Sequence, residues 1–356
     1  MISSGETLEW LPEPRVSVER IGVVLRPDGS DQEIEGVLNP GIARDRNGTV
    51  LMFPRMVAAG NRSSIGIARR ISSGEPHFER LGIVLRPEAE YELRTASGGQ
   101  GCEDARVTFL PRLDKYVMCY TAFGPLGARI ALAVSDDAYS WRRLGLVNFP
   151  GSALNARDNK DSAFFPEPVY SPGGVYSYAF YHRPMLPSTI NGQTPIPIIM
   201  ALDPSQREAT CLGYVPVEAV DRDIANLIHP AESAVVLDVG KDWGTLKNGA
   251  GTPPIRTSRG WLAFFHGVDP VERDGALALS YGAGIVVHDA DRPHIVRYRS
   301  PEPILRPITV TERFGVVNDV VFPTGIEIVS DDTFDVYYGA ADSAISLARI
   351  QVSFPD

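Results

Sequence analysis

The sequence has little cysteine, no excess of basic residues and no long apolar run, and each absence narrows the possible functions. Its three cysteines (Cys102, Cys119 and Cys211) lack the spacing of a metal site and are expected to be free thiols in a reducing compartment. A formal net charge of -10 argues against a nucleic-acid-binding protein, because phosphate backbones require a positive surface. No segment approaches the about 18 consecutive apolar residues of a membrane span. The N-terminus lacks the features of a signal peptide, so we expect a cytoplasmic protein that contacts neither nucleic acid nor membrane.

Motifs for metals and nucleotide phosphates are also missing. The spacings HxH, HExxH and CxxC do not occur, so no metal site is expected. The glycine-rich segment 98–101 is not followed by the Lys-Ser/Thr pair of a phosphate-binding loop. This segment is better interpreted as a flexible approach to Asp104.

One pattern occurs five times along the chain. Each copy has a β-like run, a polar or glycine-containing turn, an aromatic-rich run, and a third run that ends in small and charged residues. The copies begin near Pro40, Asp104, Ala163, Thr252 and Val320. Such self-similarity indicates a repeat architecture, and runs rich in Val, Ile, Tyr and Phe indicate strands. We predict an all-β fold, a five-bladed β-propeller formed as one domain by residues 1–356, with 1–38 as an entry strand and loop.

A second, shorter motif occurs three times. It reads VERIGVVLRPDG at 18–29, FERLGIVLRPEA at 78–89 and WRRLGLVNFPGS at 141–152. We predict that each copy is an outer strand that completes a blade and then enters a turn.

Polar residues recur at corresponding points near the end of the second run of each copy. They are Arg55, Tyr120-Thr121, His182-Arg183, His266 and Asp342. Each residue alone is more often structural than functional, but equivalent points of a propeller meet around one axis. Together with Lys247 and Tyr281 they predict a site for a small anion or a phosphorylated ligand. Arginine offers a planar fork that suits phosphate oxygens, and lysine adds a point charge.

A series of motifs in order over residues 36–350 resembles glycoside hydrolase family 130. The motifs include NPG, EDAR, NKDSAFFPE, YHRP, GAGTPPI, YGAGIVVHD and YYGAAD. The resemblance implies a five-bladed β-propeller enzyme from a family of inverting β-mannoside phosphorylases and some β-mannosidases.

The same resemblance implies a role for individual residues. Asp104 matches the catalytic acid, although Ala105 stands where the family has proline. The residues that match the sugar site are Asn39, Arg55, Ser64, Glu103, Lys160, Asp161 and Asp342. The residues that match the phosphate site are Arg157, Arg183, Lys247, His266 and Tyr281. At Arg157 the chain departs from the family pattern, because an extra Asp158 separates it from Asn159.

The residue types distinguish phosphorolysis from hydrolysis. An inverting hydrolase needs a second carboxylate to activate water, whereas anionic phosphate needs a cationic site that holds it in line. One acid with Arg, Lys, His and Tyr therefore predicts an inverting phosphorylase that cleaves a β-mannoside and yields α-mannose 1-phosphate. The nearby carboxylates Glu103, Asp161 and Glu167 leave a β-mannosidase open, and a non-catalytic sugar-binding propeller is the third alternative. The implied partners are a carbohydrate and inorganic phosphate as co-substrate, with no cofactor, and homo-oligomerisation is left open.

Overall fold

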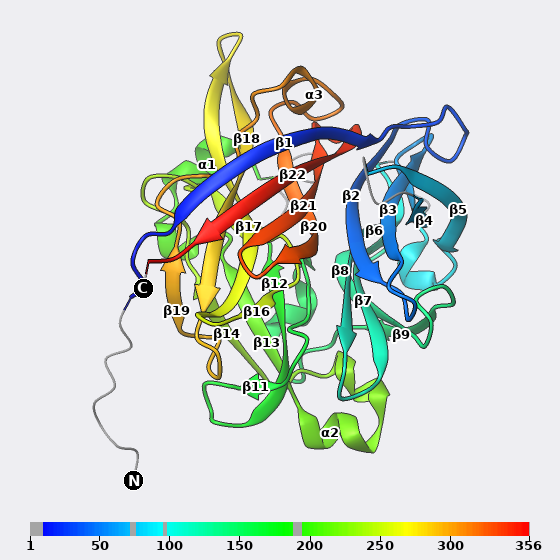
Figure 1. The fold of residues 1–356 in the computed structure, drawn as a ribbon, viewed down its shortest axis with the longest axis vertical. Helices are drawn as coiled ribbons and strands as arrows, with labels where there is room; N and C mark the ends of the chain where they lie inside the picture. Colours follow the sequence, from blue (N-terminus) through cyan, green and yellow to red (C-terminus); the bar gives the residue numbers. More distant parts are fainter. Residues whose placement is uncertain (1–9, 72–75, 95–97, 188–193, 356) are drawn as a thin grey trace.

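The computed structural model describes residues 10–71, 76–94, 98–187 and 194–355, and within them the chain consists mainly of β-strands (Figure 1). The prediction of an all-β fold is confirmed, since the described helices are all short. They are α1 (Ile196–Ala201), α2 (Val217–Arg222) and α3 (Val310–Arg313), with the 3-10 turns η1 (Glu90–Glu92), η2 (Ala153–Ala156), η3 (Pro204–Gln206) and η4 (Ile224–Ile228). None of the described helices is long and apolar enough to cross a membrane.

In the described residues the strands form five consecutive antiparallel groups. The first group contains β2 (Gly36–Arg44), β3 (Val50–Ala58), β4 (Arg62–Arg70) and β5 (Phe78–Leu85). The second contains β6 (Gln100–Leu110), β7 (Lys115–Gly124), β8 (Gly127–Ser135) and β9 (Arg142–Leu146). A short parallel contact between β4 and β6 joins these two groups into one sheet.

In the third and fourth groups the first strand is split into two short pieces. The third contains β10 (Asn159–Lys160), β11 (Val169–Tyr170), β12 (Tyr176–Pro184), β13 (Thr210–Pro216) and β14 (Glu232–Leu237). The fourth contains β15 (Lys247–Ala250), β16 (Ile255–Thr257), β17 (Gly260–Arg273), β18 (Ala276–His288) and β19 (Val296–Arg299). The five starting points inferred from the sequence lie in or beside the first strands of the five groups, so the sequence repeat corresponds to these groups.

The fifth group contains both ends of the chain. Its members are β20 (Val321–Ser330), β21 (Thr333–Ala340), β22 (Ala344–Ser353) and β1 (Arg15–Leu25). Strand β1 pairs with β22 along its whole length, so the N-terminal strand lies beside the C-terminal one (Figure 1).

The three copies of the shorter sequence motif form β1, β5 and β9, which confirms the predicted outer strands. Each strand pairs at only one side and contains a glycine in the left-handed region: Gly22 at φ 119°, Gly82 at φ 125° and Gly145 at φ 117°. The strand register shifts beside each glycine. Only glycine adopts this conformation without a steric penalty, and the resulting bulge bends the edge strand.

An ion pair between a partly exposed arginine and a buried glutamate accompanies each copy of this motif. Arg143 of β9 donates from Nε to Oε1 of Glu92 at 2.8 Å, and its Nη2 donates to the carbonyl oxygen of Arg86 at 2.5 Å. The pairs Arg80–Glu33 and Arg20–Glu312 repeat this arrangement. Each glutamate is at most 1% exposed and lies on the connection that enters the same group. The repeated arginine therefore fixes the outer strand of each of these three groups to the connection that leads into the group.

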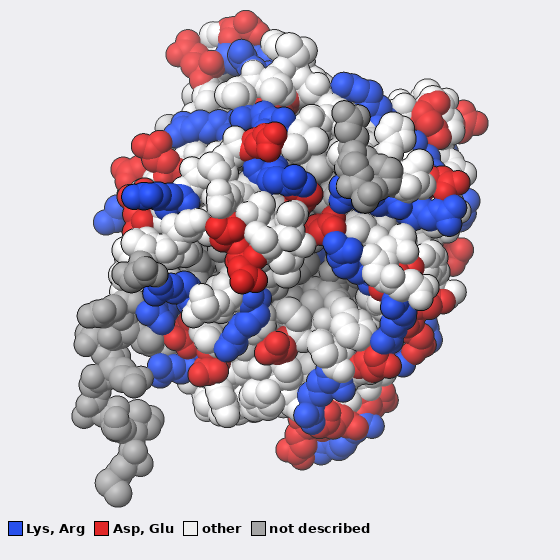
Figure 2. All heavy atoms as spheres, in the orientation of Figure 1, with Lys and Arg blue, Asp and Glu red and all other residues white. Residues whose placement is uncertain are grey.

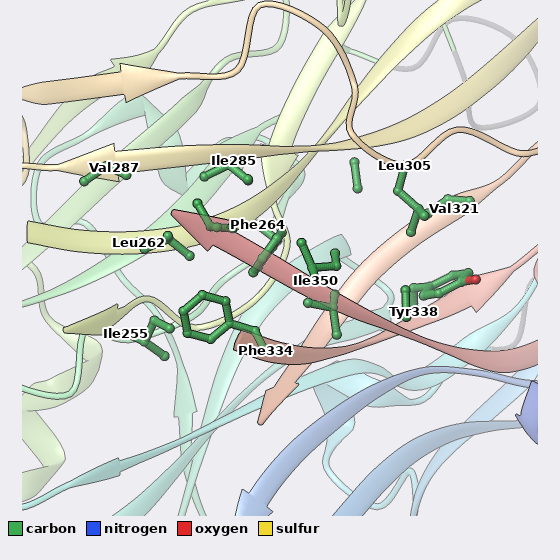
Figure 3. Close-up of a cluster of buried hydrophobic side chains, with 14 of the residues drawn as sticks. Ile255, Leu262, Phe264, Ile285, Val287, Leu305, Val321, Phe334, Tyr338 and Ile350 are labelled. Atoms are coloured by element: carbon green, nitrogen blue, oxygen red, sulfur yellow. The ribbon is translucent and has the colours of Figure 1, made fainter. Parts of the chain in front are cut away.

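Apolar clusters fill the space between neighbouring groups. Between the fourth and fifth groups, Phe264 and Ile285 pack with Phe334 and Ile350 (Figure 3). The ring centroids of Phe264 and Phe334 are 6.2 Å apart, and all four side chains are at most 2% exposed. Burying one such side chain contributes about 1.5–3 kcal/mol, so this packing holds the strands and the polar residues at their ends in place.

Candidate active site

Four of the predicted site residues have a left-handed backbone. Asn39 lies at φ 44°, Asp104 at φ 51°, Asp161 at φ 59° and Asp342 at φ 49°. Asparagine and aspartate tolerate this region better than other residues with a Cβ. Asn39 and Asp104 also lie where the register of β2 and β6 shifts, and such bulges change the direction of a side chain. The local sequence thus turns these polar groups out of the regular sheet pattern.

Asp104 lies in a network of buried hydrogen bonds. Its Oδ1 accepts from Nδ2 of Asn39 at 2.9 Å and from Nη1 of Arg55 at 3.3 Å. Arg55 also donates from Nη2 to Oε1 of Glu103 at 2.9 Å and from Nε to Oγ of Ser63 at 2.9 Å. The structure therefore brings together residues from β2, β3, β4 and β6 that the sequence separates. We call Asn39, Arg55, Glu103 and Asp104 the acid cluster.

The charges around Asp104 favour its ionised form. Burial would raise the pKa of Asp104, but Arg55, Arg106 and Lys160, with the hydrogen bond from Asn39, hold that pKa below its usual value. Lys160 is half-buried on β10. Arg106 donates to three carbonyl oxygens and is almost fully buried, so it stabilises the backbone around Asp104 from inside the protein.

A second cluster, about Arg183, has members on β12, β15, β17 and β18. Arg183 donates from Nε to Oδ2 of Asp161 at 2.7 Å and forms an ion pair through Nη1 with Glu208. Nε2 of His266 is 3.6 Å from Oδ2 of Asp161, and Arg106 Nη2 is 3.9 Å from Oδ1 of the same carboxylate. Burial would raise the pKa of Asp161, but the charged Arg183 and Arg106 hold it well below its usual value.

His266 is fully buried, and neither ring nitrogen has a hydrogen-bond partner among the described residues. Burial lowers its pKa well below the usual value, against the opposing effect of Asp161, so the ring is neutral. The ring stacks on Tyr281 at 6.2 Å between centroids and packs on Phe322 at 4.4 Å. Nζ of Lys247 lies 5.4 Å from the centre of the Tyr281 ring. We call Arg183, Lys247, His266 and Tyr281 the cationic cluster.

The donors of the cationic cluster suit an anion. An orphaned buried polar group is costly unless a ligand or water satisfies it. Burial lowers the pKa of Lys247, and the nearby Arg183 and Lys160 lower it further, which shows that positive charge is concentrated here. On the face seen in Figure 2, by contrast, Lys and Arg side chains are intermixed with Asp and Glu. The cationic cluster is thus a local feature of an acidic protein.

Comparison with known proteins identifies the family. A family profile described as β-1,4-mannooligosaccharide phosphorylase matches residues 237–354. A 1,2-β-oligomannan phosphorylase of Thermoanaerobacter sp. (strain X514) is 29% identical over 339 residues, which cover 92% of this chain and 95% of that protein. A β-1,2-mannobiose phosphorylase of the same organism is 30% identical over 293 residues, covering 81% and 77% respectively. The chain belongs to glycoside hydrolase family 130.

A solved structure of the family shares the fold. The β-1,2-mannobiose phosphorylase from Listeria innocua, in complex with β-1,2-mannobiose, superposes with a TM-score of 0.70 at 23% identity. The match covers 95% of this chain and 97% of that one.

Several residues that resemblance to family 130 singled out lie outside the two clusters. Arg157 is exposed and forms the C-cap of η2. Ser64 pairs with Met56 on β3, whereas Arg55 contacts the preceding residue, Ser63. Successive residues of a strand point to opposite faces, so Ser64 does not share the face of Arg55.

Two other residues from the recurring set contact different parts of the fold. His182 has Nδ1 next to the side chain of Asn159 at 3.1 Å and Nε2 next to Oγ of Ser233 at 2.9 Å. Burial lowers its pKa to about 3, so His182 is a neutral structural residue. Tyr120 donates its hydroxyl to Glu92, at the base of an outer strand.

No role was expected from the sequence for four residues that contact the clusters: Ser63, Arg106, Glu208 and Phe322. Arg106 is the last residue of the EDAR motif, so this motif could have indicated it. Glu208 lies in no repeated pattern, and only the fold reveals its contact with Arg183.

Asp342 differs from Asp104 in its protonation. Burial raises the pKa of Asp342 to about 6, although Arg55 and Lys160 oppose this effect, and the carboxylates of Asp104 and Glu103 add to it. A carboxyl whose pKa is raised in the folded state stabilises the fold fully below its unfolded pKa. That contribution is lost as the pH rises through about 6.

The variant Asp342→Asn is therefore expected to be more stable than the wild type at pH 7, by up to about 3 kcal/mol. The gain should shrink as the pH falls below about 6 and be small near about pH 3, where the wild-type carboxyl is largely protonated in both states. Denaturant unfolding at the two pH values measures the difference, and mannoside KM measures the expected loss of sugar binding. An equal gain in stability at both pH values would show that ionisation of Asp342 does not cause the gain.

Proposed function

We propose that the five strand groups are the blades of one five-bladed β-propeller formed by the whole chain. The antiparallel pairing within each group, the join between β1 and β22, and the fold shared with the L. innocua enzyme support this arrangement. The acid and cationic clusters then meet at the inner strands, where a propeller binds its ligands.

The protein is proposed to be an inverting β-mannoside phosphorylase. Asp104 delivers a proton to the leaving glycosidic oxygen while a phosphate oxygen attacks C1 from the opposite face of the mannose. The C1–O bond to the leaving sugar breaks as the C1–O bond to phosphate forms, and the product is α-mannose 1-phosphate. A bound sugar excludes water from Asp104 and so raises its pKa toward the range in which a carboxyl donates a proton.

One observation carries this proposal: the buried His266, which has no hydrogen-bond partner among the described residues, lies beside Arg183, Lys247 and Tyr281. These groups supply donors and positive charge for phosphate, and Arg183 adds its charge and its Nη2 donor. The nearby carboxylates favour the same conclusion. Of the three carboxylates that left a hydrolase open, Glu103 pairs with Arg55, Asp161 pairs with Arg183, and Glu167 is exposed. An unpaired carboxylate at the site, as a water-activating base would be, is not among these three.

The test compares cleavage with and without phosphate. The names of two relatives point to β-1,2-linked mannosides and the family profile to β-1,4-linked ones, so both mannobioses are incubated with the protein. We expect cleavage only with phosphate, with α-mannose 1-phosphate and mannose as products by NMR. Equal rates in phosphate-free buffer, with release of mannose alone, would instead identify a β-mannosidase. Binding without cleavage would identify a non-catalytic protein.

A further inference from the structure

Glu208 lies against the cationic cluster but belongs to none of the motifs that mark the site. Its carboxylate is 6% exposed and forms an ion pair with Nη1 of Arg183. Its other oxygen, Oε1, accepts from the backbone N–H of Leu186 at 3.1 Å. A carboxylate buried so deeply must have a specific partner, because an unpaired charge there would cost several kcal/mol.

Two carboxylates share the guanidinium of Arg183. Asp161 accepts from Nε and Glu208 from Nη1, so the fork is held at two of its three nitrogens. Both carboxylates and the arginine are almost completely buried. Among the described residues these bonds leave Nη2 as the donor for a ligand. The plane of the guanidinium, and hence the direction of Nη2, is fixed by two separate anchors.

Glu208 also joins the strands that carry the other cations. Its carbonyl oxygen accepts from the N–H of Asn248 at 3.1 Å, and Glu208 forms a parallel bridge with Lys247. One residue thus contacts Arg183 through its side chain and the start of β15 through its backbone. The separation between Arg183 and Lys247 therefore depends on Glu208.

We propose that Glu208 is a positioning residue for phosphate, which acts by orienting Arg183 and by setting its distance from Lys247. This inference rests on the proposed phosphorylase function and assigns a residue that neither the motifs nor the family resemblance marks. A buried ion pair contributes little to stability compared with apolar packing, so orientation of the guanidinium is a better reason for this pair than stability.

The test is the variant Glu208→Gln, which keeps the size of the side chain but removes its charge. We expect the KM for phosphate to rise about 10- to 100-fold, since loss of an orienting partner misplaces a binding group. The KM for the mannoside should not change. Melting temperature with and without inorganic phosphate gives a readout independent of turnover, and the stabilisation by phosphate should shrink in the variant. The control is Glu218→Gln, an exposed glutamate of α2 paired only with Arg222 among the described residues.

A double-mutant cycle separates positioning from general destabilisation. Arg183→Lys keeps the charge but removes the planar guanidinium, so Glu208 has no plane to orient in this variant. Adding Glu208→Gln to Arg183→Lys should then change the phosphate KM little, whereas additive effects would overturn the proposal. An unchanged or lower phosphate KM in Glu208→Gln, with a normal melting temperature, would also overturn it. A wild-type protein that cleaves without phosphate would instead refute the proposed function.

Discussion

Replacing Asp104 by asparagine is expected to lower kcat by about 10²–10⁴-fold, the usual contribution of a general acid. The change removes the proton donor but keeps the shape of the side chain, and asparagine tolerates the left-handed backbone at this position. Steady-state rates with a mannobiose and saturating phosphate measure the loss. Circular dichroism and the melting temperature check that the fold is intact.

The matched control for this variant is Asp114→Asn. Asp114 also has a left-handed backbone, at φ 51°, and also pairs with an arginine, Arg46, but it lies on the surface. Its replacement should leave activity at the wild-type value. Near-normal turnover in Asp104→Asn would assign the acid to another carboxyl, and the raised pKa of Asp342 would make that residue the next candidate.

Replacing Lys247 by alanine is expected to raise the KM for phosphate by about 10- to 100-fold, because a hydrogen bond to a charged group is worth about 1.5–3 kcal/mol. The KM for the mannoside should change less, since the variant removes a charge that faces the anion. The comparison variant is Lys241→Ala, at an exposed lysine on the connection before β15. Equal losses for phosphate and mannoside would contradict a role specific to the anion.

The same lysine predicts a pH dependence. Burial and the neighbouring cations lower the pKa of Lys247, so it loses its proton at a lower pH than an ordinary lysine. Only the protonated form attracts phosphate. The wild-type KM for phosphate should therefore rise as the pH increases through this lowered pKa, and this rise should be absent in Lys247→Ala.

The sequence predicted the strands and the residues of the acid and cationic clusters. It did not predict the contacts that hold these residues in place. The repeated arginines of the outer strands are visible in the sequence, but their partners Glu33, Glu92 and Glu312 are not. Each glutamate lies in a different connection, and such pairing depends on the packing of distant elements. Motif order placed Asp161 with the sugar residues, whereas the structure places it against Arg183 and His266.

The choice between Ser63 and Ser64 shows a second limit. A shift of one residue along a strand moves a side chain to the opposite face, so positions transferred by resemblance are sensitive to a single step in register. The bulges of β2 and β6 add such steps beside Asn39 and Asp104. The left-handed Asn and Asp residues were the local signal that could have located these bulges.

The pairing of β1 with β22 affects when this protein becomes active during its synthesis. Domains fold as their chain leaves the ribosome, N-terminal parts first. Here the first long strand must wait for the last one, because residues 15–25 find their partner only at residues 345–353. Asp342 lies just before β22, so the chain must be synthesised at least as far as this strand before the acid cluster and Asp342 can come together. A chain that stops before β22 would therefore leave the edge of β1 that pairs with β22 exposed, and such an unpaired edge favours association with other chains.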